Sequence, residues 1–287
     1  MKKILLLALA ITMILSLGAC TQAKSEEVFK IGAIPDLNVS DLARGYDDFA
    51  KYLSDETGMT VEYVPSVDYA ALVTAFERGE IHMAWFGGLT GVQARAVVPE
   101  AEAIAQRPQD AQFQSVFIQQ KGLGLTKLED LAGMNFSFGS ESSTSGHLMP
   151  RFFMGEAGVD PDTDLDGNPN YSGSHDKTYK LVESGAFKTG AVNIQYWEKA
   201  VNEKTVDLDK VEAFYTTPEY YDYNWTINDV DKLFGEGTKQ KVKEVLLSMD
   251  KDDSLVMELL SAEKFVETNN SNYEAIRNVA LKLGIIK

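Results

Sequence analysis

Apolar and polar residues follow one another along the first third of the chain in a repeating strand–helix pattern. Short apolar runs, one of them ended by Pro35, predict strands. Between them, apolar residues recur every third or fourth position, with Ser40 and Asp68 as expected N-caps and Gly58 as a stop. A β-α-β-α-β-α order predicts a mostly parallel sheet covered by helices. The predicted strands are 29–35, 61–64 and 81–86, and the predicted helices are 40–53, 68–79 and 89–97.

The pattern restarts after residue 113, and the chain after residue 230 is mainly helical in its spacing. Two α/β halves, the first resumed after the second, predict an α/β protein of two lobes with a ligand cleft between them. The predicted strands of the second half are 114–119, 134–139, 189–194 and 211–216, and its helices are 127–131, 148–157, 176–183 and 196–204. We expect one lobe from 28–112 with 218–287, the other from 113–217, and crossings near 108–116 and 214–222.

The N-terminus predicts export and a lipid anchor. Lys2 and Lys3 precede an apolar run over residues 4–17, which is typical of a signal peptide and too short for a membrane span. Leu17-Gly18-Ala19-Cys20 resembles the bacterial lipobox, so we expect removal of residues 1–19, a lipid on Cys20 and a tether over 20–27. The alternative is an ordinary signal peptide with an incidental cysteine. The protein would then be held at the outer face of the cell membrane, or in the periplasm, by its lipid.

Composition narrows the function. A net charge of −16 at neutral pH argues against nucleic-acid binding, which needs a basic surface. It does not exclude a small anion, because a local array of N–H donors binds anions on an acidic protein. The chain has 3 Trp, 12 Tyr and 14 Phe, enough for a large folded core, and its single cysteine forms no internal disulfide.

The strongest candidate site is the run Ser143-Thr144-Ser145-Gly146-His147, between a predicted strand and a predicted helix. A helix start leaves backbone N–H groups unpaired, and with the hydroxyls and the helix dipole these make an anion site. His147 and His175 both fall at predicted helix starts and, as neutral donors, suit an oxyanion. The alternatives are a solvated serine-rich turn and half-exposed structural histidines.

Further candidates come from the ends of other elements. Tyr69 opens a predicted helix and offers a hydroxyl to the cleft, and Trp85 ends a predicted strand before Gly87-Gly88, which permits close approach of a ligand. The aromatic run 220–225 either lines the ligand site or packs in the core of the hinge. The sequence has no nucleophile elbow, phosphate-binding loop or zinc spacing, so we expect no enzyme, no cofactor and no metal.

These motifs, in this order, resemble those of solute-binding proteins of phosphate, phosphite and phosphonate ABC importers, including a branch also described as selenate-binding. The resemblance implies a type II periplasmic-binding fold that closes on a tetrahedral oxyanion and delivers it to a permease and its ATPase, acting as a monomer. By position it implies that Ser143, Thr144 and Ser145 clasp the oxyanion, with Tyr69 and His175 as donors and Asp222 nearby. Residues 193–196 lack the glutamate that aminophosphonate binders present to an ammonium group.

The choice of ligand stays open at this level. Phosphite, phosphonates and phosphate carry a proton near neutral pH, and this P–OH needs an acceptor, whereas sulfate and selenate need donors only. A carboxylate in the pocket, Asp68 or Asp222, would favour the protonated ligands. The alternatives are a binder of selenate or another oxyanion, a lipoprotein that presents its ligand to a membrane kinase, an exported phosphate-ester hydrolase, and a binder of a neutral or cationic nutrient.

Overall fold

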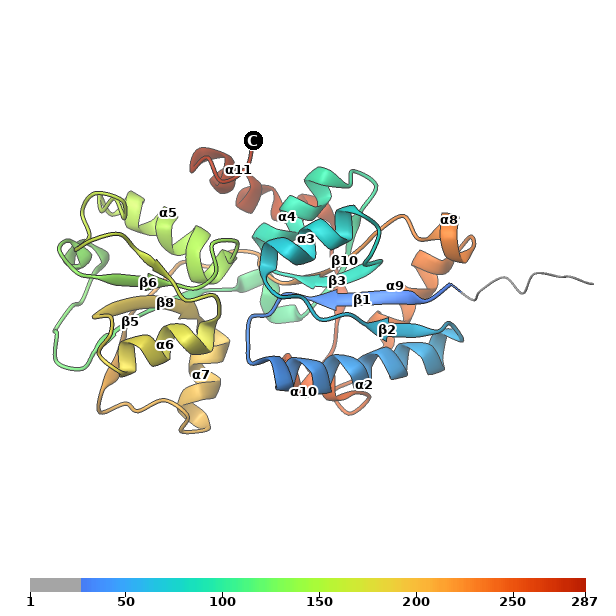
Figure 1. Cartoon of the computed structure of the whole chain (residues 1–287), viewed down its shortest axis with the longest axis horizontal. Coiled ribbons are helices and arrows are strands. Elements are labelled where there is room, and N and C mark those ends of the chain that lie inside the picture. Colours follow the sequence, from blue (N-terminus) through green and yellow to red (C-terminus); the bar gives the residue numbers. More distant parts are fainter. Residues whose placement is uncertain (1–26) are drawn as a thin grey trace, which may run out of the picture.

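Two β-sheets, each covered by helices, lie side by side along the longest axis of the molecule (Figure 1). The computed structural model describes residues 27–287. The first sheet has the strand order β11-β4-β10-β3-β1-β2 and the second has the order β7-β6-β8-β5-β9. The first comprises β1 (Phe29–Ala33), β2 (Val61–Tyr63), β3 (Met83–Phe86), β4 (Glu102–Gln106), β10 (Asn224–Ile227) and β11 (Val266–Glu267), and the second comprises β5 (Ser115–Gln120), β6 (Phe136–Phe138), β7 (Asn170–Tyr171), β8 (Thr189–Asn193) and β9 (Val211–Thr216).

Most strands of each sheet run in one direction, as predicted, and each sheet also contains at least one strand that runs against them. The β1–β2, β1–β3, β6–β7 and β6–β8 pairs are parallel, as helix-connected strands require. In contrast, β10 runs antiparallel between β3 and β4, and β5 runs antiparallel between β8 and β9. The reason is the crossing of the chain between the lobes: β10 enters the first sheet from the second lobe and fills its centre against the direction of its neighbours.

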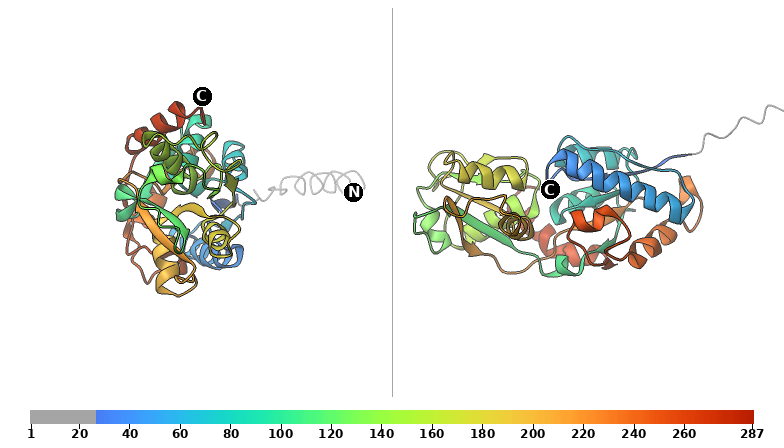
Figure 2. Two further views of the ribbon diagram at one scale, coloured as in Figure 1. Left: turned by 90° about the vertical axis from the view of Figure 1, so that its left-hand side faces the viewer. Right: turned by 90° about the horizontal axis from the view of Figure 1, so that it is seen from below.

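Helices cover both faces of each sheet, and the two further views show the same pair of layered lobes (Figure 2). Asn38, not Ser40, caps the first described helix, while Asp68 caps the next as predicted and Gly58 adopts the left-handed conformation at φ 71°. The helices are α2 (Val39–Thr57), α3 (Tyr69–Glu77), α4 (Gly88–Val97), α5 (Met149–Glu156), α6 (His175–Glu183), α7 (Ile194–Asn202), α8 (Asp231–Phe234), α9 (Thr238–Ser248), α10 (Leu255–Leu259) and α11 (Glu274–Lys282), with short helical turns η1 (Pro108–Gln112), η2 (Leu128–Leu131), η3 (Thr144–Leu148) and η4 (Asn270–Tyr273).

Two chain crossings join the lobes. Phe113 and Tyr220 lie on the two crossings and exchange a pair of backbone hydrogen bonds of 2.8 and 2.9 Å. All strands between these residues belong to the second sheet, and all others belong to the first. This distribution supports the predicted lobe boundaries at residues 113 and 217, which we keep as working boundaries.

The predicted signal peptide and Cys20 lie outside the described residues. Over residues 27–287, no helix has the length and apolar character needed to cross a membrane.

Candidate functional site

The serine–threonine run forms the start of a helix, as its sequence predicts, but through an unusual turn. Ser143 is the N-cap, and its hydroxyl accepts a hydrogen bond of 2.9 Å from the N–H of Gly146. The first turn, η3, is π-helical and begins at Thr144, earlier than the predicted start at Leu148, and it continues into α5. A helix start offers its first N–H groups outward because no carbonyl of the helix reaches them.

Gly146 permits the tight packing of this turn. A Cβ at this position would lie 2.9 Å from Oγ of Ser143, 3.1 Å from Cε1 of His175 and 3.2 Å from Cα of Gly139. Real Cβ atoms essentially never come within 3.0 Å of another heavy atom, and contacts of 3.0–3.4 Å are unusually tight. The backbone of the turn and the ring of His175 therefore meet because residue 146 has no side chain.

A second helix start faces the first from the other lobe. Gly87 caps α4, so Gly87-Gly88 forms a helix start and not a simple turn. The N–H of Gly88 donates to Oδ1 of Asp222 at 2.8 Å, and the N–H of Leu89 donates to Oγ1 of Thr144 at 2.9 Å. Thr144 therefore ties the two lobes together where both helix starts concentrate partial positive charge.

Tyr69 and His175 bring two buried donors to the same space. Tyr69 is the first residue of α3, and its hydroxyl is fully buried with no protein partner. The hydroxyl lies near the Ser143 side chain and the Asp222 carboxyl, and burial raises its pKa far above the ordinary value. His175 is the first residue of α6, and its Nε2 is likewise buried without a partner. Buried donors of this kind cost stability unless a ligand accepts from them.

The protonation state of His175 follows from its neighbours. Its Nδ1 accepts a hydrogen bond of 3.2 Å from the N–H of Asn193, so the proton of the neutral ring sits on Nε2. Burial lowers the pKa of His175 to about 3, which keeps the ring neutral at physiological pH. His175 is therefore a neutral donor.

Asp222 supplies the one unpaired acceptor among these groups. Its Oδ1 is held by the N–H of Gly88, while its Oδ2 is buried with no partner. Burial raises the pKa of Asp222 to about 7, although the N–H of Gly88 and the hydroxyls of Thr144 and Ser145 lower it in part. The carboxyl therefore exchanges a proton near neutral pH, the range in which phosphorus oxyanions also do so.

Two predicted site residues lie elsewhere. The ring of His147 is engaged within its own lobe: Nδ1 contacts the carbonyl of Glu141 at 2.6 Å, and Nε2 accepts from Arg151 at 3.0 Å. Trp85 is buried in the core of the first lobe, where its ring stacks on Tyr223 at 5.6 Å between centroids. The geometry places neither side chain with Tyr69, His175 and Asp222.

Sequence reasoning missed Asp36 and Tyr196. The Tyr196 hydroxyl donates to Oδ2 of Asp36 at 2.9 Å, and both residues are buried. Burial raises the pKa of Asp36 to about 6. The negative charges of Asp36 and Asp222 both raise the pKa of Tyr69 and of Tyr223, so both carboxyls lie near these two hydroxyls. The available signal was the position of Asp36 directly after strand β1, at the cleft end of the sheet.

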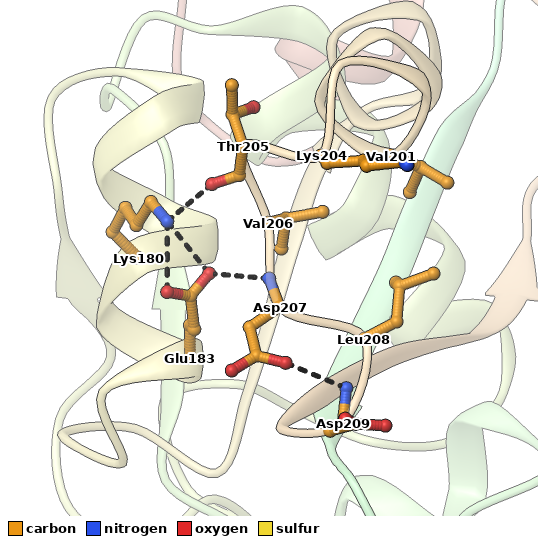
Figure 3. Close-up of a pocket in the computed structure, with 9 residues that line it drawn as sticks. All are labelled: Lys180, Glu183, Val201, Lys204, Thr205, Val206, Asp207, Leu208 and Asp209. Atoms are coloured by element: carbon orange, nitrogen blue, oxygen red, sulfur yellow. Dashed lines mark hydrogen bonds and ion pairs between the residues drawn. The ribbon is translucent and has the colours of Figure 1, made fainter.

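The open hollow in Figure 3 is a separate feature on the second lobe. Lys180 and Glu183 both lie on α6 at one side of the hollow, and each carboxylate oxygen of Glu183 lies 2.9 Å from Nζ of Lys180. None of the predicted site residues lines it. Over residues 27–287, no group of three His, Cys, Asp or Glu side chains is placed to hold a metal ion.

Buried polar groups that converge between two lobes are typical of a small-ligand binding site. A family model described as "ABC transporter, phosphonate, periplasmic substrate-binding protein" matches residues 31–273. The chain belongs to this family.

The relatives agree with this membership. The chain is 39% identical over 271 residues to the probable ABC transporter phosphite binding protein PhnD1 of Prochlorococcus marinus, covering 91% of each chain. The solved structure of that PhnD1 in complex with methylphosphonate superimposes with a TM-score of 0.87, covering 91% of this chain and all of that one, and it confirms the predicted two-lobe fold. The phosphate-import protein PhnD of Mycolicibacterium smegmatis is 30% identical over 174 residues, which cover 57% of this chain and 54% of that protein.

Proposed function

We propose that this member of the family captures a small phosphorus oxyanion, of the phosphite, methylphosphonate or phosphate class, between its lobes. The observation that carries the proposal is the set of three buried, unpaired polar atoms: the Tyr69 hydroxyl, Nε2 of His175 and Oδ2 of Asp222. Two are donors and one is an acceptor. A monoprotonated tetrahedral oxyanion satisfies all three, because it accepts through its bare oxygens and donates through its P–OH.

The helix start provides the rest of the proposed site. Ser143, Thr144, Ser145 and Gly146 present hydroxyls and the first N–H groups of η3, at the positive end of a helix. Binding then needs no arginine or metal. In the unliganded protein the site costs stability, so ligand binding and lobe closure stabilise each other.

Asp222 gives the site its proposed selectivity. Sulfate and selenate carry no proton near neutral pH, so an ionised Asp222 meets one of their oxygens with a like charge and no hydrogen bond. The relative from Prochlorococcus marinus is described as a probable phosphite binding protein, and its solved structure is in complex with methylphosphonate, which supports the same ligand class here. We propose that the protein binds its ligand and releases it without chemical change.

We also propose that the mature protein is anchored by a lipid on Cys20 and serves the permease as a monomer. The apolar run and the lipobox-like Leu17-Gly18-Ala19-Cys20 support the anchor. A lipid tether keeps the protein close to its membrane partner and raises its effective concentration there.

Calorimetric titration of the purified protein, washed free of bound ligand, tests the ligand class. We expect phosphite, methylphosphonate or phosphate to bind, and sulfate and selenate to bind weakly or not at all. Tight binding of sulfate or selenate with no response to the phosphorus anions would overturn the proposal.

A further inference from the structure

A hydrogen bond between two side chains joins the lobes beside the proposed site. The Tyr196 hydroxyl, on α7 of the second lobe, donates to Oδ2 of Asp36, in the loop after β1 of the first lobe, at 2.9 Å. The N–H of His175 also donates to the carbonyl of Asp36, at 3.3 Å. Asp36 therefore receives two bonds from the opposite lobe, and both depend on the lobes being closed.

The pair lies beside the proposed ligand space. The Tyr196 ring packs against the ring of His175 with 5.6 Å between centroids, and the Nε2 of His175 is one of the unpaired donors. The charges of Asp36 and Asp222 both raise the pKa of the Tyr69 hydroxyl. Asp36 and Tyr196 therefore lie close to the groups of the proposed site.

Tyr196 also lines a groove of about 540 Å³ between the lobes. The walls of the groove come from α2 and α10 of the first lobe and from α6 and α7 of the second, which flank the junction of the lobes in Figure 1. Leu37, the residue after Asp36, lines the same groove, whereas Asp36 itself is buried. Tyr196 thus contacts both His175 of the proposed site and the open groove.

We propose that Asp36 and Tyr196 form the gate of the binding site, and that the ligand enters and leaves through this groove when their hydrogen bond opens. The inference rests on the proposed function for the identity of the ligand. A bond made only in the closed state stabilises that state, so it acts on the release of ligand more than on its capture. Asp36 and Tyr196 are then residues that set how long the ligand stays bound.

The test compares release rates of methylphosphonate, measured by phosphorus NMR exchange, with affinities from calorimetry. Tyr196→Phe keeps the ring and removes the donor, so we expect release roughly 10-fold faster with an unchanged association rate. Asp36→Ala should behave in the same way. Asp36→Asn keeps an oxygen that accepts from Tyr196 and should restore release to near the wild-type rate.

Tyr179→Phe is the matched control, because Tyr179 lines the same groove from the second lobe alone. It should release methylphosphonate at the wild-type rate. Equal release rates for wild type and Tyr196→Phe would overturn the gate, as would an Asp36→Asn variant that releases as fast as Asp36→Ala.

A second measurement separates failure of the gate from failure of the proposed function. If the wild-type protein binds no phosphorus anion, small-angle X-ray scattering of the ligand-free proteins still tests the gate. A gate predicts that Tyr196→Phe has a larger radius of gyration than wild type and Tyr179→Phe, because its closed state is less populated. Three equal radii would overturn the gate whatever the ligand is.

Discussion

The backbone N–H of Asn193 donates to Nδ1 of His175 at 3.2 Å and so directs the proton of the imidazole to Nε2. Asn193 ends β8 and His175 begins α6, so the bond fixes a helix start against a strand end. Burial lowers the pKa of His175 to about 3. The ring therefore enters the site as a neutral, oriented donor whose state does not change across physiological pH.

His175→Ala removes this donor, and we expect the affinity for methylphosphonate to fall by about 1.5–3 kcal/mol, the range for a hydrogen bond to a charged group. Calorimetry measures the loss. His147→Gln is the control, since the His147 ring bonds to Glu141 and Arg151 within the second lobe. That variant should melt at a lower temperature but bind with nearly wild-type affinity. If His175→Ala binds methylphosphonate as tightly as wild type, His175 is not part of the ligand site.

Gly146→Ala tests the close packing of the helix start. The added methyl group would meet Oγ of Ser143 at 2.9 Å and the backbone of Gly139 at 3.2 Å, so the turn must shift. We expect a loss of stability of about 1–3 kcal/mol, typical of overpacking, together with weaker ligand binding.

Gly155→Ala on the same helix is the matched control for this change. A Cβ there meets nothing within 4 Å. Alanine should raise the free energy of unfolding by about 0.5–1 kcal/mol without altering affinity. If both glycine variants bind methylphosphonate as wild type does, the turn does not shape the site.

The buried carboxyls predict an unusual dependence of stability on pH. Burial raises the pKa of Asp222 to about 7 and that of Asp36 to about 6, whereas an unfolded aspartate titrates near ~3.9. The folded protein therefore holds more protons between these values. The stability that these groups contribute is fully present below about pH 4 and is lost as pH rises through 6 to 7.

Asp222→Asn removes one of these ionisations. We expect its melting temperature to exceed that of the ligand-free wild type in mildly alkaline buffer, and the difference to shrink as the pH is lowered. Thermal melting of both proteins across this range measures it. A variant less stable than wild type at alkaline pH would show that Asp222 is not held in a site that resists its ionisation.

The proposed lipid anchor is tested apart from ligand binding. Cys20→Ser removes the only cysteine in the chain and with it the attachment point. We expect the variant to move from the membrane fraction to the soluble fraction on cell fractionation while its affinity for methylphosphonate stays the same. Wild-type protein found wholly in the soluble fraction would contradict the anchor.

Local patterns predicted the helix starts of the site well. The run Ser143–Gly146 reads as a cap followed by a helix because capping depends on a few neighbouring residues. Asp68 gave the position of Tyr69 for the same reason, since it is the N-cap of α3. His175 was also expected at a helix start, although the sequence analysis did not identify Ser174 as its N-cap. Those residues point into the cleft because helices of such folds begin at the ends of strands that face it.

Contacts between segments far apart in the chain could not be predicted from the sequence. Nothing near Asn224 indicates that β10 will lie antiparallel between β3 and β4, because that choice depends on where the chain crosses back. Asp36 and Tyr196 are 160 positions apart, so their bond has no local signature. His147 illustrates a different limit, since the π-helical turn directs its ring toward Phe138 and Tyr171. The sequence spacing alone gave no sign of that turn.

The central claim, that the unpaired oxygen of the Asp222 carboxyl selects protonated phosphorus oxyanions, is tested most directly by comparing methylphosphonate with methanesulfonate at neutral pH. The two anions have nearly the same shape, but only methylphosphonate carries an exchangeable proton for Oδ2 of Asp222. We predict that wild type binds methylphosphonate at least roughly 10-fold more tightly, and that Asp222→Asn, which presents a donor there, narrows or reverses the preference. Equal affinities in the wild-type protein, or a preference that Asp222→Asn leaves intact, would contradict the account.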